Sequence, residues 1–160
     1  ERFVVYTALT EAPQQQYDVI LLSHVLEHVE TPVKFLRVIR NLLTKEGFLY
    51  IEVPCLTDPL LWAYKIPAFW DFYWQYPHIW YFAPLALHRL LNISGYIVTH
   101  ARGFQRYGLS NHLQWLSEGA PGPGENFAQY TSEAHDLDYR KRLVGSGYYD
   151  TLWLQCRVSS

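Results

Sequence analysis

The fold is decided by Tyr17-Asp-Val-Ile-Leu-Leu-Ser23 and Phe48-Leu-Tyr-Ile-Glu-Val53. The first stretch is a short apolar run with β-branched residues, which predicts a strand buried on both faces and therefore a parallel sheet. The second stretch predicts another strand, which Pro54 ends.

The residues between these two strands predict a helix. Thr31 supplies an N-cap hydroxyl, and Pro32 suits the first helical position. Apolar residues then follow at helical spacing: Phe35, Leu36, Ile39, Leu42 and Leu43. Gly47 is placed to end the helix in a left-handed conformation. Strand, helix and strand together predict a βαβ unit with a right-handed crossover.

Further elements are predicted downstream. They are a helix over 84–93, a strand over 96–101, helices near 111–116 and 125–143, and a last strand over 151–158. Apolar and polar residues alternate in the last strand, which predicts an antiparallel strand with a more exposed face. If it lies beside the strand that ends at Pro54, Cys55 and Cys156 are about 20 Å apart. That separation is too large for a disulfide bond.

The composition limits the classes of function. The chain has 160 residues, of which 49% are hydrophobic, as expected for a single folded domain. Its 13 basic and 15 acidic residues lack the basic excess of a nucleic-acid-binding protein. No apolar run is long enough to cross a membrane. Two cysteines fit a reducing compartment, so a cytoplasmic location is expected. The sequence contains no methionine, which suggests a piece of a longer polypeptide.

His24-Val-Leu-Glu27-His28 matches the H-x-x-E-H pattern of inverted zincins, in which two histidines on one helical face bind zinc. A zinc hydrolase acting through His24, Glu27 and His28 is therefore one alternative. The context argues against it, because the motif directly follows a strand and Thr31-Pro32 starts a new helix three residues later. A turn whose histidines cap or pack is a second alternative. The preferred interpretation contains no metal.

An ordered set of motifs resembles the second half of class I S-adenosylmethionine-dependent methyltransferases. The set consists of 17–28 (YDVILLSHVLEH), Thr31-Pro32, 42–47 (LLTKEG), 50–54 (YIEVP) and the later segment Pro77-His-Ile-Trp-Tyr-Phe82. The resemblance covers roughly residues 17 to 104. It implies an α/β, Rossmann-like methyltransferase sheet that is partial and has an antiparallel last strand.

In that family the sheet has seven strands in the order 3-2-1-4-5-7-6, and the resemblance implies that this chain carries strands 4, 5, 6 and 7. The earlier strands are then missing or incomplete, although Phe3-Val-Val-Tyr6 is a candidate for the third. The whole chain, 1–160, is expected to be a single domain, with residues 105–147 as a helical insertion before the last strand. No G-x-G-x-x-G motif follows a strand, so the glycine-rich cofactor turn belongs upstream.

The resemblance implies where the cofactor S-adenosylmethionine binds. Ligands of open α/β sheets lie beyond the carboxyl ends of the parallel strands. Ser23 and His24 stand at such an end and are assigned to the cofactor's polar end, and Leu26 in the following turn is assigned to the cofactor as well. His28, also in that turn, is assigned to the substrate. The alternative for Ser23 and His24 is capping of backbone groups.

An aromatic belt follows, because 11 of the 27 aromatic residues lie between Trp62 and Phe82. Five of them are predicted to wall an apolar chamber and to face the cationic sulfonium: Trp62, Trp70, Trp74, Trp80 and Tyr81. Packing of a cap or of an oligomer interface is the alternative. His78 is the candidate catalytic base, since an imidazole titrates near neutrality, with a packing histidine as its alternative.

The predicted function is methyl transfer from S-adenosylmethionine to a small-molecule acceptor. The isolated chain is expected to be inactive and to bind the cofactor poorly, because half of the pocket is absent. The alternative is a non-catalytic interaction module that uses the belt or the exposed sheet edge for assembly. An uncovered strand edge favours association, so a homodimer is expected with either function. No nucleic-acid or membrane partner is expected.

Overall fold

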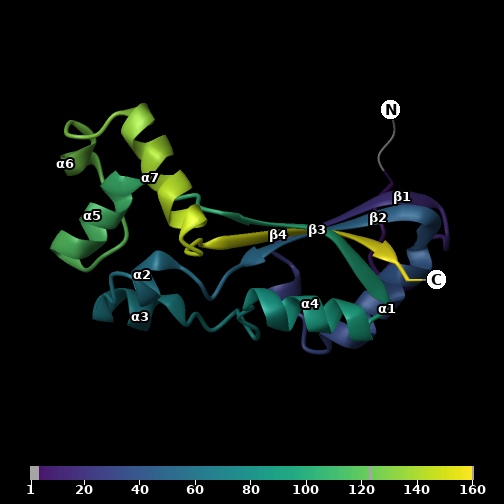
Figure 1. The fold of residues 1–160 in the computed structure, drawn as a ribbon. Helices are drawn as coiled ribbons and strands as arrows, with labels where there is room; N and C mark the ends of the chain where they lie inside the picture. Colours follow the sequence, from purple (N-terminus) through teal and green to yellow (C-terminus); the bar gives the residue numbers. More distant parts are fainter. Residues whose placement is uncertain (1–3, 123, 160) are drawn as a thin grey trace.

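The computed structural model describes residues 4–122 and 124–159, which contain one four-stranded sheet (Figure 1). Its strands are β1 (Tyr17–Ser23), β2 (Leu43–Pro54), β3 (Tyr96–Phe104) and β4 (Thr151–Val158), in the order β1-β2-β4-β3. β1 and β2 are parallel, whereas β4 is antiparallel to β2 and to β3. The predicted α/β fold with an antiparallel last strand is therefore confirmed. The order is also the one expected for four neighbouring family strands, although their numbering within the family sheet stays a prediction.

The helices form two groups in Figure 1. α1 (Pro32–Leu42) and α4 (Pro84–Ile93) lie on one face of the sheet, and the remaining helices lie around the other end of the strands. These remaining elements are η2 (Leu26–His28), α2 (Pro59–Trp62), α3 (Pro67–Tyr73), α5 (Leu109–Glu118), α6 (Glu125–Ala128) and α7 (Glu133–Gly145). A further 3-10 turn, η1 (Leu9–Glu11), precedes β1. The predicted helix over 84–93 thus has the bounds of α4, and the one near 125–143 is divided into α6 and α7.

The βαβ unit is present, but two of its predicted end signals are wrong. Thr31 precedes α1 without a side-chain capping hydrogen bond. The helix ends at Leu42 because Leu43 already pairs with Tyr17 of β1. Gly47 therefore lies inside β2, outside the left-handed region. Glycine is needed there for another reason, since a Cβ would stand 2.9 Å from the Tyr17 carbonyl oxygen.

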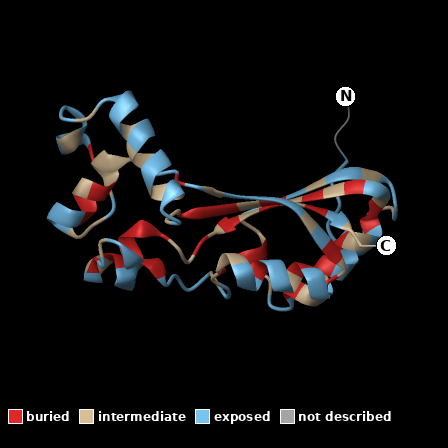
Figure 2. Ribbon diagram, in the orientation of Figure 1, coloured by how far each residue is buried: buried red, intermediate tan, exposed pale blue. Residues whose placement is uncertain are grey.

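The hydrophobic core lies between the sheet and the pair α1 and α4 (Figure 2). Alternate residues of β2, which include Leu49, Ile51 and Val53, are fully buried in it, as the two-residue period of a strand requires. The prediction that β1 is buried on both faces is wrong, because Val19 and Leu21 are 57% and 63% exposed. These two residues lie on the face opposite the core, which carries neither α1 nor α4.

The candidate third strand is also not formed. Val4 and Val5 are exposed and belong to no strand, and Phe3 lies outside the described residues. β1 is consequently an edge strand of the described sheet.

The cysteines lie far apart, as predicted. Cys156 pairs with Leu49 in the register of β2 and β4, six positions before Cys55, and both thiols are buried and free. Within the described residues, no helix combines the length and the apolar character needed to cross a bilayer.

The burial pattern predicts the stability effect of a change in β2. Ile51 is fully buried and pairs with Leu22 on one side and Leu154 on the other. Ile51→Ala should lower the free energy of unfolding by about 2 to 5 kcal/mol, because it leaves a cavity at the centre of the core. Urea denaturation measures this change. Ile97→Ala on β3 is the control, since Ile97 is 53% exposed and should cost under about 1 kcal/mol; equal losses would contradict the one-sided core.

Candidate functional site

The carboxyl ends of β1 and β2 meet at one edge of the sheet, because the two strands are parallel and Ser23 pairs with Glu52. The His24 backbone N–H extends this pairing by donating to the Glu52 carbonyl at 2.9 Å. His24 itself has a φ of 51°, so the chain leaves the sheet in a left-handed residue and turns into η2. Ser23 and His24 therefore stand where they were predicted, whereas the Leu26 side chain is buried in the core below the turn.

The turn after β1 holds a buried carboxyl group. Glu27 is 1% exposed, and its Oε1 lies 3.2 Å from His24 Nδ1 and 3.9 Å from His28 Nε2. Its Oε2 is buried and has no hydrogen-bond partner among the described residues. The other nitrogen of His24, Nε2, lies 3.4 Å from Glu52 Oε1 and 3.3 Å from Arg106 Nη1. Two carboxyl groups and the Arg106 guanidinium thus surround the His24 imidazole at the edge of the sheet.

Backbone hydrogen bonds bring the segment 77–80 against this turn. The N–H groups of Ile79 and Trp80 both donate to the Glu27 carbonyl, at 2.8 and 3.1 Å. As a result the rings of His28 and His78 touch edge to face, with centroids 4.9 Å apart. Burial lowers the pKa of His78, and the neighbouring Glu27 carboxylate opposes that shift only in part. Three histidines named from the sequence, His24, His28 and His78, are therefore gathered around Glu27.

A cavity of ≈ 610 Å³ opens beside this cluster. Pro54 at the end of β2 and His78 both line it. Its apolar wall includes Phe69, Phe72 and Trp115, and its polar wall includes Asp58, Gln75, Arg106, Asn111 and Asp150. A volume of this size suits a small molecule with an apolar body and a few polar groups.

The polar wall is built around two carboxyl groups. Asp150 accepts from the Arg106 backbone N–H at 2.9 Å and from Arg106 Nε at 3.2 Å. Asp58 caps α2 by accepting from the Leu60 N–H at 2.8 Å and is 6% exposed. Burial raises the pKa of Asp58 to about 7, the Asp150 carboxylate adds to the rise, and Arg106 opposes it. Asp58 thus titrates close to neutral pH.

Three of these wall residues, Asp58, Arg106 and Asp150, were not predicted from the sequence as site residues. Arg106 and Asp150 lie 44 positions apart without any motif. A carboxyl group four residues after the end of a parallel strand was the available signal for Asp58. The Arg106–Asp150 pair depends on the pairing of β3 with β4, in which Phe104 faces Thr151.

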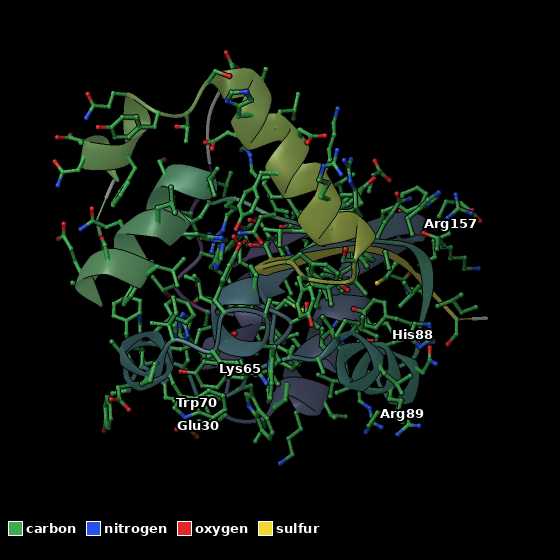
Figure 3. All side chains as sticks on the ribbon, turned by 60° about the vertical axis from the view of Figure 1, so that its left-hand side comes forward. Glu30, Lys65, Trp70, His88, Arg89 and Arg157 are labelled. Atoms are coloured by element: carbon green, nitrogen blue, oxygen red, sulfur yellow. The ribbon has the colours of Figure 1, made fainter. Side chains whose placement is uncertain are left out.

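The five aromatic residues assigned to one chamber lie in different surroundings. Trp62, Trp70, Trp74 and Tyr81 form a chain of ring contacts with centroid distances of 5.7, 5.3 and 4.7 Å. Trp62 and Trp70 are 48% and 41% exposed and line a shallow hollow with Lys65. Trp70 and Lys65 are labelled in Figure 3. Trp80 and Tyr81 line a separate groove against α1, where Trp80 Nε1 donates to the Val29 carbonyl at 2.8 Å. None of the five lines the ≈ 610 Å³ cavity, whose aromatic wall comes from their neighbours in the belt.

The H-x-x-E-H motif is not on a continuous helix, as its context predicted. His24 is left-handed, η2 spans only three residues, and α1 begins at Pro32. The helical face on which a zincin places both histidines is therefore not formed.

Comparisons with known proteins show the family and the fold of the chain. The model of a family described as a methyltransferase domain matches residues 1–101. The chain is similar to a SAM-dependent methyltransferase from Archaeoglobus fulgidus, with a TM-score of 0.54 and 15% identity over 93% of this chain and 62% of that one. It is also similar to an S-adenosylmethionine-dependent methyltransferase from Mesorhizobium loti, with a TM-score of 0.51 and 15% identity over 91% and 63% of the two chains.

A third similar structure is the mitomycin 7-O-methyltransferase MmcR, with a TM-score of 0.54 and 13% identity over 98% of this chain and 34% of that one. A search of curated proteins finds no match. At these identities the structural likeness shows the fold. The chain spans less than two thirds of the length of each of these three structures.

The pKa of Asp58 predicts how stability depends on pH. The folded pKa is about 7 and the ordinary value is 3.8, so between these values the folded chain holds a proton that the unfolded chain has released. The stability that this proton supplies is complete below about pH 4 and is lost as the pH rises through 7. Asp58→Asn removes the titration and keeps an oxygen to cap α2. The variant should therefore gain up to about 4 kcal/mol in free energy of unfolding relative to the wild type between pH 4 and 8.

Urea denaturation at several pH values measures this difference. Asp138→Asn is the control, since Asp138 is exposed and pairs with Arg142 on the same helix. A difference between Asp58→Asn and wild type that stays constant with pH would show that Asp58 titrates as an ordinary carboxyl group.

Proposed function

The chain belongs to the class I S-adenosylmethionine-dependent methyltransferase family, and on that premise we propose that it contributes the acceptor cavity and one side of the cofactor site to methyl transfer onto a small molecule. One observation carries the proposal. The Arg106 guanidinium bridges the two sites, with Nη1 3.3 Å from His24 at the strand edge and Nε 3.2 Å from Asp150 in the cavity wall. A methyl donor at the edge and an acceptor in the cavity would then be neighbours.

The residues at the edge fit one side of S-adenosylmethionine. The cofactor carries a positive sulfonium, an ammonium group and two ribose hydroxyls, all of which interact favourably with carboxylates. Glu52 supplies a partly exposed carboxylate beside His24, and the Ser23 hydroxyl lies 3.5 Å from Glu52 Oε2. The glycine-rich turn that would hold the other side is absent from this sequence. We therefore assign Ser23 and His24 to the cofactor, as the resemblance implies, with Leu26 supporting the turn from the core.

The cavity fits a small acceptor with a ring or another apolar body. Phe69, Phe72 and Trp115 supply apolar contacts, while Asn111 and Gln75 offer amide groups that can orient a polar substituent. Its ≈ 610 Å³ lies within the usual range for small-molecule sites. His28 reaches the same region through its contact with His78. Trp74 and Tyr81 do not line the cavity, but they pack against Tyr73, which does.

Bound S-adenosylmethionine supplies an electrophilic methyl group. The chain's own residues align the acceptor, exclude water and take up the proton that the acceptor loses. Two groups on the cavity wall suit the last task, His78 and Asp58. Asp58 has a pKa of about 7, which is close to the value that a general base needs at neutral pH. His78 is uncharged at that pH because burial lowers its pKa.

A non-catalytic interaction module remains the second candidate, and the bare face of β1 favours it. Val19 and Leu21 lie there on an edge strand and are more than half exposed. Such a surface is suited to association with another strand or chain. The homodimer and the cytoplasmic location stay predictions of the sequence.

Titration with S-adenosylhomocysteine distinguishes the two candidates. We expect weak binding to the 160-residue chain, with a Kd above about 100 μM, because only one side of the pocket is present. Amide NMR signals of Ser23, His24 and residues 26–28 should shift during the titration, and those of His100 on the exposed part of β3 should not. Micromolar binding would contradict the one-sided pocket. An absence of shifts at 23–28 in millimolar ligand would contradict the methyltransferase proposal and leave the interaction module.

A further inference from the structure

The carboxyl group of Glu27 is buried beside two histidines. Its side chain is 1% exposed, and its ion-pair contacts among the described residues are with His24 and His28, not with lysine or arginine. Its Oε2 has no hydrogen-bond partner there. Burying a carboxylate without a compensating cation or donor is costly, so proteins pair such groups or use them as metal ligands. A positively charged partner at Oε2 of Glu27 would therefore lower the cost of burying this group.

His28 is already arranged as a metal ligand. Its Nδ1 lies 2.7 Å from the Pro77 carbonyl oxygen, which only accepts hydrogen bonds. The proton of a neutral ring must then be on Nδ1, and Nε2 keeps its lone pair on the side of Glu27, 3.9 Å from Oε1. Metal-binding histidines typically fix their tautomer in this way, by donating the other ring N–H to a carbonyl or carboxylate.

His78 is the third side chain that lies beside Glu27 and His28. The ligand atoms of Glu27, His28 and His78 all lie within 4.8 Å of one another. Ligand atoms about 2.0 to 2.2 Å from a tetrahedral ion are about 3.4 Å from one another. Side-chain rotations that move the three ligand atoms by about 1 Å therefore bring them into position. The backbone of the segment that carries His78 is already fixed against the turn. The N–H groups of Ile79 and Trp80 donate to the Glu27 carbonyl.

We propose that Glu27, His28 and His78 bind a divalent transition-metal ion. Two imidazoles and one carboxylate favour zinc, cobalt or a similar first-row ion over magnesium or calcium, which prefer all-oxygen sites. Three protein ligands leave at least one coordination position open. Since His78 lines the ≈ 610 Å³ cavity, the ion would lie beside the acceptor site.

This site differs from the one that the H-x-x-E-H motif suggests. Both ring nitrogens of His24 are already engaged, Nδ1 with Glu27 and Nε2 with Glu52 and Arg106. His24 is therefore a positioning residue that holds the Glu27 carboxylate. The third ligand comes from position 78, which is 50 residues beyond His28 and belongs to another segment.

The proposed metal site does not depend on the proposed function. One consequence of the site does rest on that function. An acceptor hydroxyl in the cavity could occupy the open position, and coordination would lower its pKa so that its proton passes to solvent water. His78 would then act as a ligand in place of a base. Acceptors with a hydroxyl group would be preferred over amines.

Metal titration of the chelator-treated 160-residue chain tests the site, with Zn²⁺ followed by calorimetry and Co²⁺ by its visible absorption. We expect one ion per chain and a coordination spectrum that contains nitrogen ligands. His78→Gln should weaken binding at least tenfold, because it removes one of three ligands. His88→Gln is the matched control, since His88 is an exposed histidine on α4, away from the cluster (Figure 3).

Each possible result of these titrations supports or contradicts the proposed metal site. Glu27→Gln alters a buried side chain and could unfold the chain, whereas His78 is only partly buried, so His78→Gln gives the decisive comparison. Absence of binding to the wild type, equal affinity in His78→Gln, or an equal loss in His88→Gln would each overturn it. Zinc binding that depends on His78, without any S-adenosylhomocysteine shift at 23–28, would support the metal site and reject the methyltransferase proposal.

Discussion

The parallel pairing of β1 with β2 is the constraint on which the rest of the structure depends. Because the register joins Ser23 to Glu52 and continues to the His24 N–H, two carboxyl ends of strands finish side by side. A parallel pair needs a crossover, and α1 supplies it while covering one face. Ser23, His24 and Glu27 lie at the edge that this pairing creates, and Pro54 at the end of β2 lines the cavity beside it.

The one-sided core follows from the same arrangement. Leu49, Ile51 and Leu154 are covered by α1 and α4, while the opposite face carries Tyr50, Trp153 and the exposed Val19. In a doubly wound α/β fold both faces of the sheet carry helices. In the described part of this chain, α1 and α4 cover only one face of β1, which accounts for the exposure of Val19 and Leu21 on the other.

The turn after β1 and the segment 77–80 form a single structural unit. The Glu27 carbonyl accepts two backbone hydrogen bonds from that segment, and the His28 ring donates to Pro77. These bonds hold two histidines beside a buried carboxyl group. Arg106 ties this unit to the Asp150 side of the cavity, so the edge of the sheet and the cavity wall share one polar network.

The sequence by itself determined the local elements and the edge on which the site lies. Periodicity placed both strands, α1 and α4, and the position of Ser23 and His24 followed from the strand end. These features depend on neighbouring residues along the chain, which a sequence displays directly. Only the tertiary structure decided that Val19 is exposed, that Asp58 has a raised pKa, and that His78 joins Glu27. Exposure, desolvation and long-range contacts depend on which segments cover one another, and no local pattern specifies that.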